Sequence, residues 1–240
     1  MTEMAVQTSG TRQDRSAAPV RKRHWLRWVV TGLAAVLVLA FAGTYSYIHF
    51  LAGPVPAPLA LPRLSPAAAG KGSPPADGAW TAGHGSLAGY RVREEFFGPG
   101  NSLVGRTGAV TGTVVIARND VTSASFRVDL TAVTSGGKAQ PQLAKILGTA
   151  SFPDATFTLT RPIAVSSGLV MNKTFTVTVT GTLAMHGMTR LVTFGASARY
   201  SGSLLEVAGS IPVTFSAWNI RTPALLQNHG LLEFLLVLRR

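Results

Sequence analysis

The chain has 240 residues and carries 22 Lys and Arg against 10 Asp and Glu, so its net charge is +12. It contains no Cys, which excludes a disulfide framework, thiolate metal ligands and a lipidated N-terminal Cys. Beyond residue 27 the cations are mostly scattered singly, whereas nucleic-acid-binding proteins usually gather them on one face. We therefore predict no nucleic-acid partner and attribute the basic excess to solvation and to attraction by anionic lipid surfaces.

The first predicted element is a transmembrane helix at residues 28–50. These 23 residues include no Lys, Arg, Asp or Glu, and as a helix they would extend roughly 35 Å, enough for a hydrocarbon core of about 30 Å. Residues 1–27 carry six Lys and Arg against two Asp and Glu, and the next cation is Arg63. Because positive flanks stay inside, this pattern predicts a cytoplasmic segment at 1–27 and an extracytoplasmic domain beyond the helix.

A cleaved signal peptide is the main alternative to this anchor. Ala40, Phe41 and Ala42 have the small-x-small form of a cleavage site, and residues 29–39 have the length of a signal-peptide core. Hydrophobicity continues past that site to Leu51, which favours a retained anchor. Cleavage after Ala42 would secrete the domain, so both interpretations export it. A buried helix of a soluble protein is the least favoured interpretation, because such helices rarely run this long behind a basic block.

A linker is predicted at residues 51–78. It contains seven Pro among Ala, Gly and Ser, a composition that buries too little apolar surface to fold and favours extended polyproline-II geometry. Its expected role is to hold the following domain away from the bilayer.

Residues 79–240 form one predicted all-β domain. Apolar and polar residues alternate along 126–131 and again along 174–180, which is the strand signature. The predicted strands are 86–97, 103–117, 121–133, 156–165, 174–185, 189–200, 204–215 and 231–239, with one short helix at 140–147. Eight long antiparallel strands avoid exposed edges best when they close, so the expected fold is an eight-stranded antiparallel barrel.

The last predicted strand differs from the others. Residues 231–238 are apolar on both faces apart from Glu233. We therefore expect both faces to be covered, either by the short helix or by a second copy of the chain in a homodimer.

Catalytic and metal-binding patterns are not found in the sequence. His84, His186 and His229 each lie beside a Gly without a second ligand at helix spacing, so they are better explained as turn residues. Glu94 and Glu95 are neighbours, so on a strand they point to opposite faces. No nucleophile elbow, P-loop or dinucleotide motif occurs. The sequence predicts no catalytic residue, no metal site, no cofactor and no enzyme activity.

Several motifs resemble the YceI-like polyisoprenoid-binding proteins of bacterial periplasms. Residues 181–190, Gly-Thr-Leu-Ala-Met-His-Gly-Met-Thr-Arg, resemble a hairpin of that family. Residues 80–93 resemble its first strand, 103–112 its second, and 143–157 its short helix and the strand that follows. The resemblance covers 79–239.

Two segments depart from the pattern of this family. Residues 138–143, Lys-Ala-Gln-Pro-Gln-Leu, stand where the family usually has Arg-Asp-x-His-Leu. Residues 216–221 replace its Arg-x-x-Phe-Gly element. Both departures fall in what the resemblance makes the loop region, so they leave the choice of ligand and its access open.

The resemblance implies a lipocalin-like barrel that encloses an isoprenoid or a similar amphiphilic lipid. A site of this kind needs inward aliphatic and aromatic side chains and a polar group only at the mouth. The inward, ligand-binding candidates are Tyr90, Val92, Phe126, Val128, Phe157, Leu159, Phe175, Val177 and Phe194. Each of them is equally compatible with a filled core, so a solid barrel that serves as an interaction or structural module is the alternative. An enzyme acting on a lipid or quinone is the third and least favoured.

Overall fold

The structure is a computed structural model that describes residues 24–46, 55–63, 77–94, 102–165, 172–201, 203–224 and 226–240. The chain forms two units, Met1–Gly53 and Pro54–Arg240, and each is described by itself. The first unit contains helix α1, His24–Ser46. Within the described residues, no helix has both the length and the apolarity that crossing a bilayer requires. The transmembrane span at 28–50 therefore stays a prediction, and its last four residues lie outside the described part of the chain.

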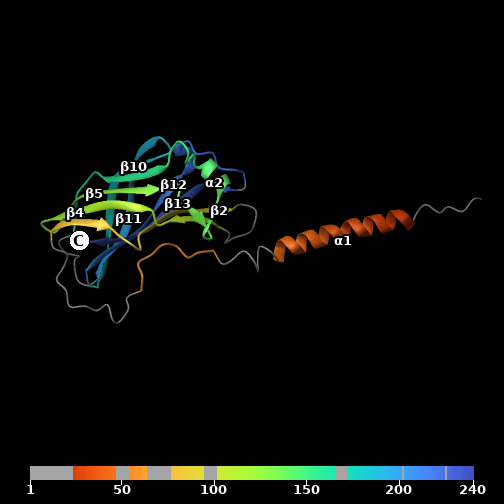
Figure 1. The fold of residues 1–240 in the computed structure, drawn as a ribbon, viewed down its shortest axis with the longest axis horizontal. Coiled ribbons are helices and arrows are strands. Elements are labelled where there is room, and N and C mark those ends of the chain that lie inside the picture. The colour runs from red at the N-terminus through yellow and green to blue at the C-terminus, as the bar shows by residue number, and fades with distance from the viewer. Residues whose placement is uncertain are drawn as a thin grey trace, which may run out of the picture. The chain divides into compact units, whose positions relative to one another are not determined.

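The second unit is built almost entirely from antiparallel strands (Figure 1). The long strands are β1 Gly78–Ala82, β2 Leu87–Glu94, β3 Ser102–Thr107, β4 Val110–Ala117, β5 Asp120–Asp129, β8 Asp154–Leu159, β10 Thr174–Met185, β11 Met188–Ser201, β12 Leu204–Thr214 and β13 Leu226–Arg239. Three two-residue strands and two short helices complete it: β6 Thr134–Ser135, β7 Lys138–Ala139, β9 Ile163–Ala164, α2 Pro141–Ile146 and η3 Phe215–Trp218.

Eight of these strands form a closed ring. The order is β1-β4-β5-β8-β10-β11-β12-β13, and β13 pairs again with β1 through Ala82 opposite Leu238. Strand β2 follows β1 after a short turn, and β4 follows β3 in the same way. Strand β1 pairs with β4 and β2 pairs with β3, so the first part of the barrel is a bent pair of long strands. Closure leaves the ring without a free edge. The predicted eight-stranded antiparallel barrel with one short helix is thus confirmed.

Several predicted boundaries were wrong for local reasons. The predicted strand 103–117 is broken at Gly108, whose carbonyl oxygen accepts a hydrogen bond from the Val110 N–H at 2.9 Å. The predicted strand 121–133 ends at Asp129, whose carboxylate accepts a hydrogen bond from the Thr131 N–H at 2.8 Å and so starts a turn. The predicted strand 156–165 is interrupted near Pro162, which has no N–H to donate to a ladder.

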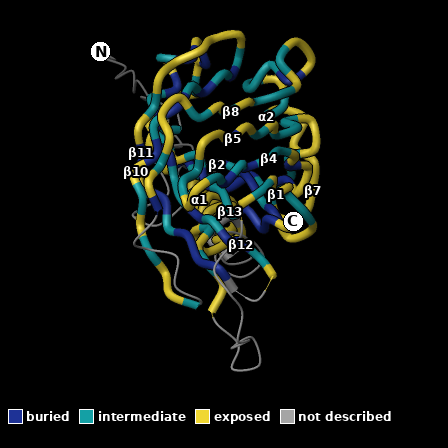
Figure 2. The backbone as a smooth tube through the Cα atoms, turned by 90° about the vertical axis from the view of Figure 1, so that its left-hand side faces the viewer, coloured by how far each residue is buried: buried dark blue, intermediate teal, exposed yellow. Residues whose placement is uncertain are grey.

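The final strand β13 starts earlier than predicted, and it is buried at Glu233 and at 236–238, whereas His229 and Leu231 are exposed. Figure 2 colours the backbone by burial. The inner side chains of β13 face the barrel interior. On the outer face, Val237 is covered by the turn after β1, where the Ser86 hydroxyl accepts a hydrogen bond from the Val237 N–H at 3.0 Å. Glu233 is covered by residues 55–63, since the Leu59 N–H donates to its Oε2 at 3.4 Å. A turn and part of the predicted linker, rather than α2, therefore cover this strand, and the homodimer stays a prediction.

Two apolar clusters pack in the barrel. One gathers around Phe194, Ile211 and Trp218, near η3, and the other around Trp80 and Leu238, where β1 meets β13. Leu159, Val207 and Phe234 pack against both clusters.

Candidate functional site

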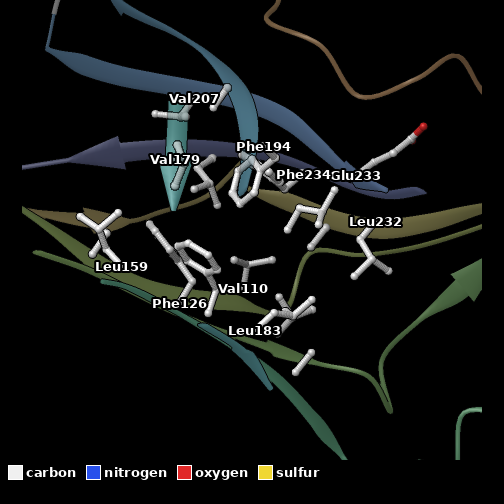
Figure 3. Close-up of a pocket in the computed structure, with 18 of the residues that line it drawn as sticks. Val110, Phe126, Leu159, Val179, Leu183, Phe194, Val207, Leu232, Glu233 and Phe234 are labelled. Atoms are coloured by element: carbon white, nitrogen blue, oxygen red, sulfur yellow. The ribbon is translucent and has the colours of Figure 1, made fainter. Parts of the chain in front are cut away.

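A cavity of about 210 Å³ lies in the barrel interior, between the two apolar clusters. Its wall is formed by inward residues of β2, β4, β5, β8, β10, β11, β12 and β13 and is almost wholly aliphatic or aromatic. Figure 3 shows this arrangement, with Phe126, Leu159, Leu183 and Phe194 around the space. An apolar cavity of this kind favours apolar matter over water, because its wall offers water few hydrogen-bond partners.

The carboxylate of Glu233, which is among the wall residues, does not point into the cavity. Figure 3 shows the end of the Glu233 side chain turned away from the apolar residues. Its Oε1 accepts a hydrogen bond from Nε of Arg91 at 2.6 Å on the outer face of the sheet. Among the described residues, the wall therefore directs no charged group at the cavity.

Three aromatic rings pack edge to face at one side of the cavity. The Phe194 ring lies 5.6 Å from that of Phe157 and 5.7 Å from that of Phe234, measured between centroids. These three rings come from β11, β8 and β13, which are far apart in sequence. Their contacts stabilise this part of the cavity wall, since edge-to-face aromatic pairs contribute stabilisation beyond that of the surface area they bury.

Eight of the nine predicted inward residues line this cavity. Val92 does not, although it is 5% exposed and packs in the cluster that includes Phe194. Phe175 lines the cavity but is only partly buried, in contrast to Phe194. That these side chains contact a ligand stays a prediction.

The wall also contains residues that the sequence did not single out. Small side chains line it on four strands, and the apolar residues of β13 face it at every second position. These residues are Ala88, Ala124, Ala155, Ala196, Leu232, Phe234 and Leu236. Alternation was present on β13, but its outer face is apolar too, so the pattern could not tell the inner face from the outer.

Tyr90 is the unusual polar member of the wall. Its hydroxyl is buried without a hydrogen-bond partner among the residues that the structure describes, and its ring lies over Gly105, where an added Cβ would come within 2.4 Å of the ring. Burial raises the pKa of the Tyr90 phenol well above its usual value, so the group stays neutral and remains a potential donor.

We expect Tyr90→Phe to leave the free energy of unfolding unchanged or to raise it by up to about 1–3 kcal/mol, because it removes an unpaired buried hydroxyl. Denaturant unfolding of the two proteins measures this difference. A loss of more than about 1 kcal/mol would contradict it, since that is the size expected for a hydroxyl with a hydrogen-bond partner.

Comparison with known proteins identifies the family of this barrel. A family model described as a YceI-like domain matches residues 83–237. The chain belongs to the YceI-like family. No curated protein is similar enough in sequence to match.

Two solved structures share the YceI-like barrel at low sequence identity. One is a polyisoprenoid-binding domain from Saccharophagus degradans implicated in plant cell wall breakdown, with 15% identity, a TM-score of 0.54, and coverage of 68% of this chain and 99% of that chain. The other is BcnA from Burkholderia cenocepacia, with 20% identity, a TM-score of 0.52, and coverage of 63% and 95%. At these identities the likeness shows the fold.

The two segments that depart from the YceI-like pattern come together beside α2. An open pocket there is lined by Gln142 from the first segment, by Asn219 and Arg221 from the second, and by Lys145 and Ile146. Ile146 ends α2, and the next residue, Leu147, lines the barrel cavity. The end of α2 thus lies between this open pocket and the apolar cavity.

The YceI-like hairpin at 181–190 has a structural role here. His186 and Gly187 form its turn with φ of 51° and 72°, the conformation of a tight hairpin. Nδ1 of His186 is 3.0 Å from the Trp218 carbonyl oxygen, and its ring packs against Phe152 at 4.7 Å. Within the described residues, no three His, Asp or Glu side chains are grouped as a metal site would require.

Proposed function

We propose that the chain binds an isoprenoid or a similar amphiphilic lipid in the barrel interior. The observation that carries this proposal is the apolar cavity, into which no charged group of the described wall points. Transfer of an apolar chain from water into such a site yields roughly 25 cal/mol per Å² of buried surface and needs no charged partner along the chain. The similar fold of a domain named for polyisoprenoid binding supports the same ligand class.

The size of the cavity limits how much of a lipid fits without movement. About 210 Å³ exceeds the roughly 150 Å³ of an apolar cavity that admits benzene, but it is below the usual 300–1,000 Å³ of ligand sites. We propose that a longer chain enters by displacing α2. This helix has six residues, no fully buried side chain and no side-chain cap at its N-terminus, so its displacement would break the packing of Leu143 and Ile146 against the core but would expose no fully buried side chain of the helix.

We propose that the polar head of the lipid lies in the pocket beside α2. Lys145 and Arg221 line that pocket, and neither forms an ion pair with the described residues. Cations at the mouth and apolar residues within match the two ends of an amphiphile.

We further propose that residues 28–50 anchor the chain in a membrane and that the barrel lies outside the cytoplasm. The support is the run without charged residues, the basic segment before it, and the exposed apolar side chains of α1, such as Trp28, Leu39 and Phe41. Cleavage after Ala42 would release the barrel on the same side.

Mass spectrometry of organic extracts of the purified full-length chain tests the ligand. We expect an isoprenoid or another amphiphilic lipid at about one molecule per chain, as one occupied interior predicts. Recovery of no stoichiometric lipid from several preparations would contradict the proposal and would leave a barrel without a small-molecule ligand. The mass of the recovered lipid decides between prenyl and acyl chains.

A further inference from the structure

Part of the predicted linker lies against the outer face of the barrel. These residues, 55–63, are drawn in orange in Figure 1, and we call them the strap. Leu59 and Leu61 are partly buried, whereas the other seven residues are exposed. The strap therefore turns one apolar edge to the barrel and its Pro and Ala residues to solvent.

Arginine side chains bind the main chain of the strap at both of its ends. Nη2 of Arg91, on β2, donates to the Pro56 carbonyl oxygen at 2.8 Å. Nη2 of Arg199, on β11, donates to the Pro62 carbonyl oxygen at 2.7 Å. In the sheet, β13 and β12 lie between β2 and β11, so the strap crosses the strands rather than adding to an edge.

Two further hydrogen bonds hold the middle of the strap. Arg106, on β3, donates from Nη2 to the Ala57 carbonyl oxygen. In the opposite direction, the Leu59 N–H donates to Oε2 of Glu233 at 3.4 Å. The barrel thus forms hydrogen bonds with three carbonyl oxygens and one N–H of the strap. An extended, polyproline-like chain leaves these groups available, because it forms no internal hydrogen bonds.

Two of the groups that bind the strap are buried although they point out of the barrel: Arg199 is 5% exposed and Glu233 is 3% exposed. Glu206, the ion-pair partner of Arg199, is 7% exposed, whereas Arg91 and Arg106 are partly buried. They belong to ion pairs: Glu206 accepts from Nη2 of Arg199 at 2.6 Å, and Glu233 accepts from Nε of Arg91 at 2.6 Å. Burying charged groups is costly unless their hydrogen bonds are complete, and the strap supplies the missing partners.

We propose that this outer face is a recognition site for an extended, proline-rich peptide, occupied by residues 55–63 of the same chain, and that docking shortens the tether of the barrel. With the strap docked, eight residues separate Ser46, the end of α1, from the strap. Released, 31 residues separate Ser46 from β1. At about 3.6 Å per residue, the maximum reach is about 32 Å in the first case and about 115 Å in the second. Docking leaves Nε of Arg106 buried without a hydrogen-bond partner among the described residues, which offsets part of the stabilisation from its Nη2 bond to the Ala57 carbonyl oxygen.

The absence of Cys makes a distance measurement direct. Spin labels are placed on the full-length chain in detergent micelles at two exposed positions, Ala60→Cys on the strap and Thr176→Cys on β10. We expect one narrow distance distribution. Adding Leu59→Ser and Leu61→Ser should replace it with a broad one, because the apolar contacts are lost while the barrel is unaltered. The matched control is Val55→Ser, at an exposed apolar strap position outside the four hydrogen bonds, which should keep the narrow distribution.

A synthetic peptide of residues 54–64 provides the second arm. In excess it should broaden the distribution by competing for the site, and the same peptide with both Leu replaced by Ser should not. A broad distribution in the unaltered strap would overturn the proposal, as would a double Leu→Ser variant that stays narrow. Spin coupling between molecules that grows with protein concentration would also overturn it, since the strap would then come from a second copy. None of these outcomes depends on whether the interior binds lipid.

Discussion

Replacing Phe194 by Ala is expected to lower the free energy of unfolding by about 3–5 kcal/mol. Its ring is 8% exposed and packs edge to face against Phe157 and Phe234, so truncation removes both aromatic contacts and enlarges the existing cavity. A domain of this size has a total stability of about 5–15 kcal/mol, so the change is a large fraction of it. Equilibrium unfolding in urea, followed by tryptophan fluorescence, measures the difference.

Leu191→Ala on the same strand is the matched control for Phe194→Ala. Leu191 is 65% exposed, and we expect a change within about 0.5 kcal/mol. If both variants lose the same stability, the ring of Phe194 is not part of a packed wall. Phe175→Ala should cost less than Phe194→Ala, because the Phe175 ring is only partly buried.

The largest functional effect is expected from Ala196→Leu, which adds three carbon atoms to the cavity wall. Ala196 is 1% exposed and lines the cavity on β11. The larger side chain occupies space that the proposed lipid needs, and we expect the lipid recovered per chain to fall at least about tenfold, the equivalent of 1.4 kcal/mol in binding. Stability should change by less than about 1–3 kcal/mol, the usual cost of overpacking, because the new side chain fills a cavity.

Thr193→Leu is the control for this variant. Thr193 lies on the outward side of the same strand and is exposed, so a Leu side chain there, which has one more heavy atom than Thr, should leave lipid recovery unchanged. Extraction and mass spectrometry are run on both variants beside the unaltered chain. Equal lipid recovery from Ala196→Leu and the unaltered chain, with both folded, would show that the lipid is bound somewhere other than this cavity.

Much of the barrel could be predicted from alternation along the chain. In a strand, side chains alternate between the two faces, so the pattern alone assigned Phe126 and Val128 on β5, or Phe175 and Val177 on β10, to one face. Turn residues separated these strands, which predicted antiparallel neighbours and a closed ring. The places where this reasoning was wrong are breaks within a ribbon, as at Gly108 and Pro162, because such breaks depend on local hydrogen bonds and on closure of the ring.

The remaining space in the interior could not be predicted. A pattern assigns a side chain to the inner face but does not say whether the inner side chains fill the volume that they enclose. That volume depends on how eight strands are paired in register, which brings Phe157, Phe194 and Phe234 together from separate parts of the chain. The unpaired hydroxyl of Tyr90 is equally invisible in sequence, since hydrogen-bond partners are a property of packing.

Docking of the strap on the outer face of the barrel could not be predicted from the sequence either. Its composition predicted a spacer, and the prediction was reasonable because Pro, Ala and Gly bury little surface among themselves. Only the folded sheet brings Arg91, Arg106 and Arg199 from three strands into a row that binds its carbonyl oxygens. The sequence alone indicated most of the strands, the side chains that share a face of each strand, and the family, because these follow from local periodicity and motifs. The tertiary structure decided the cavity, the pocket beside α2 and the docked strap, because each depends on contacts between residues distant in the chain.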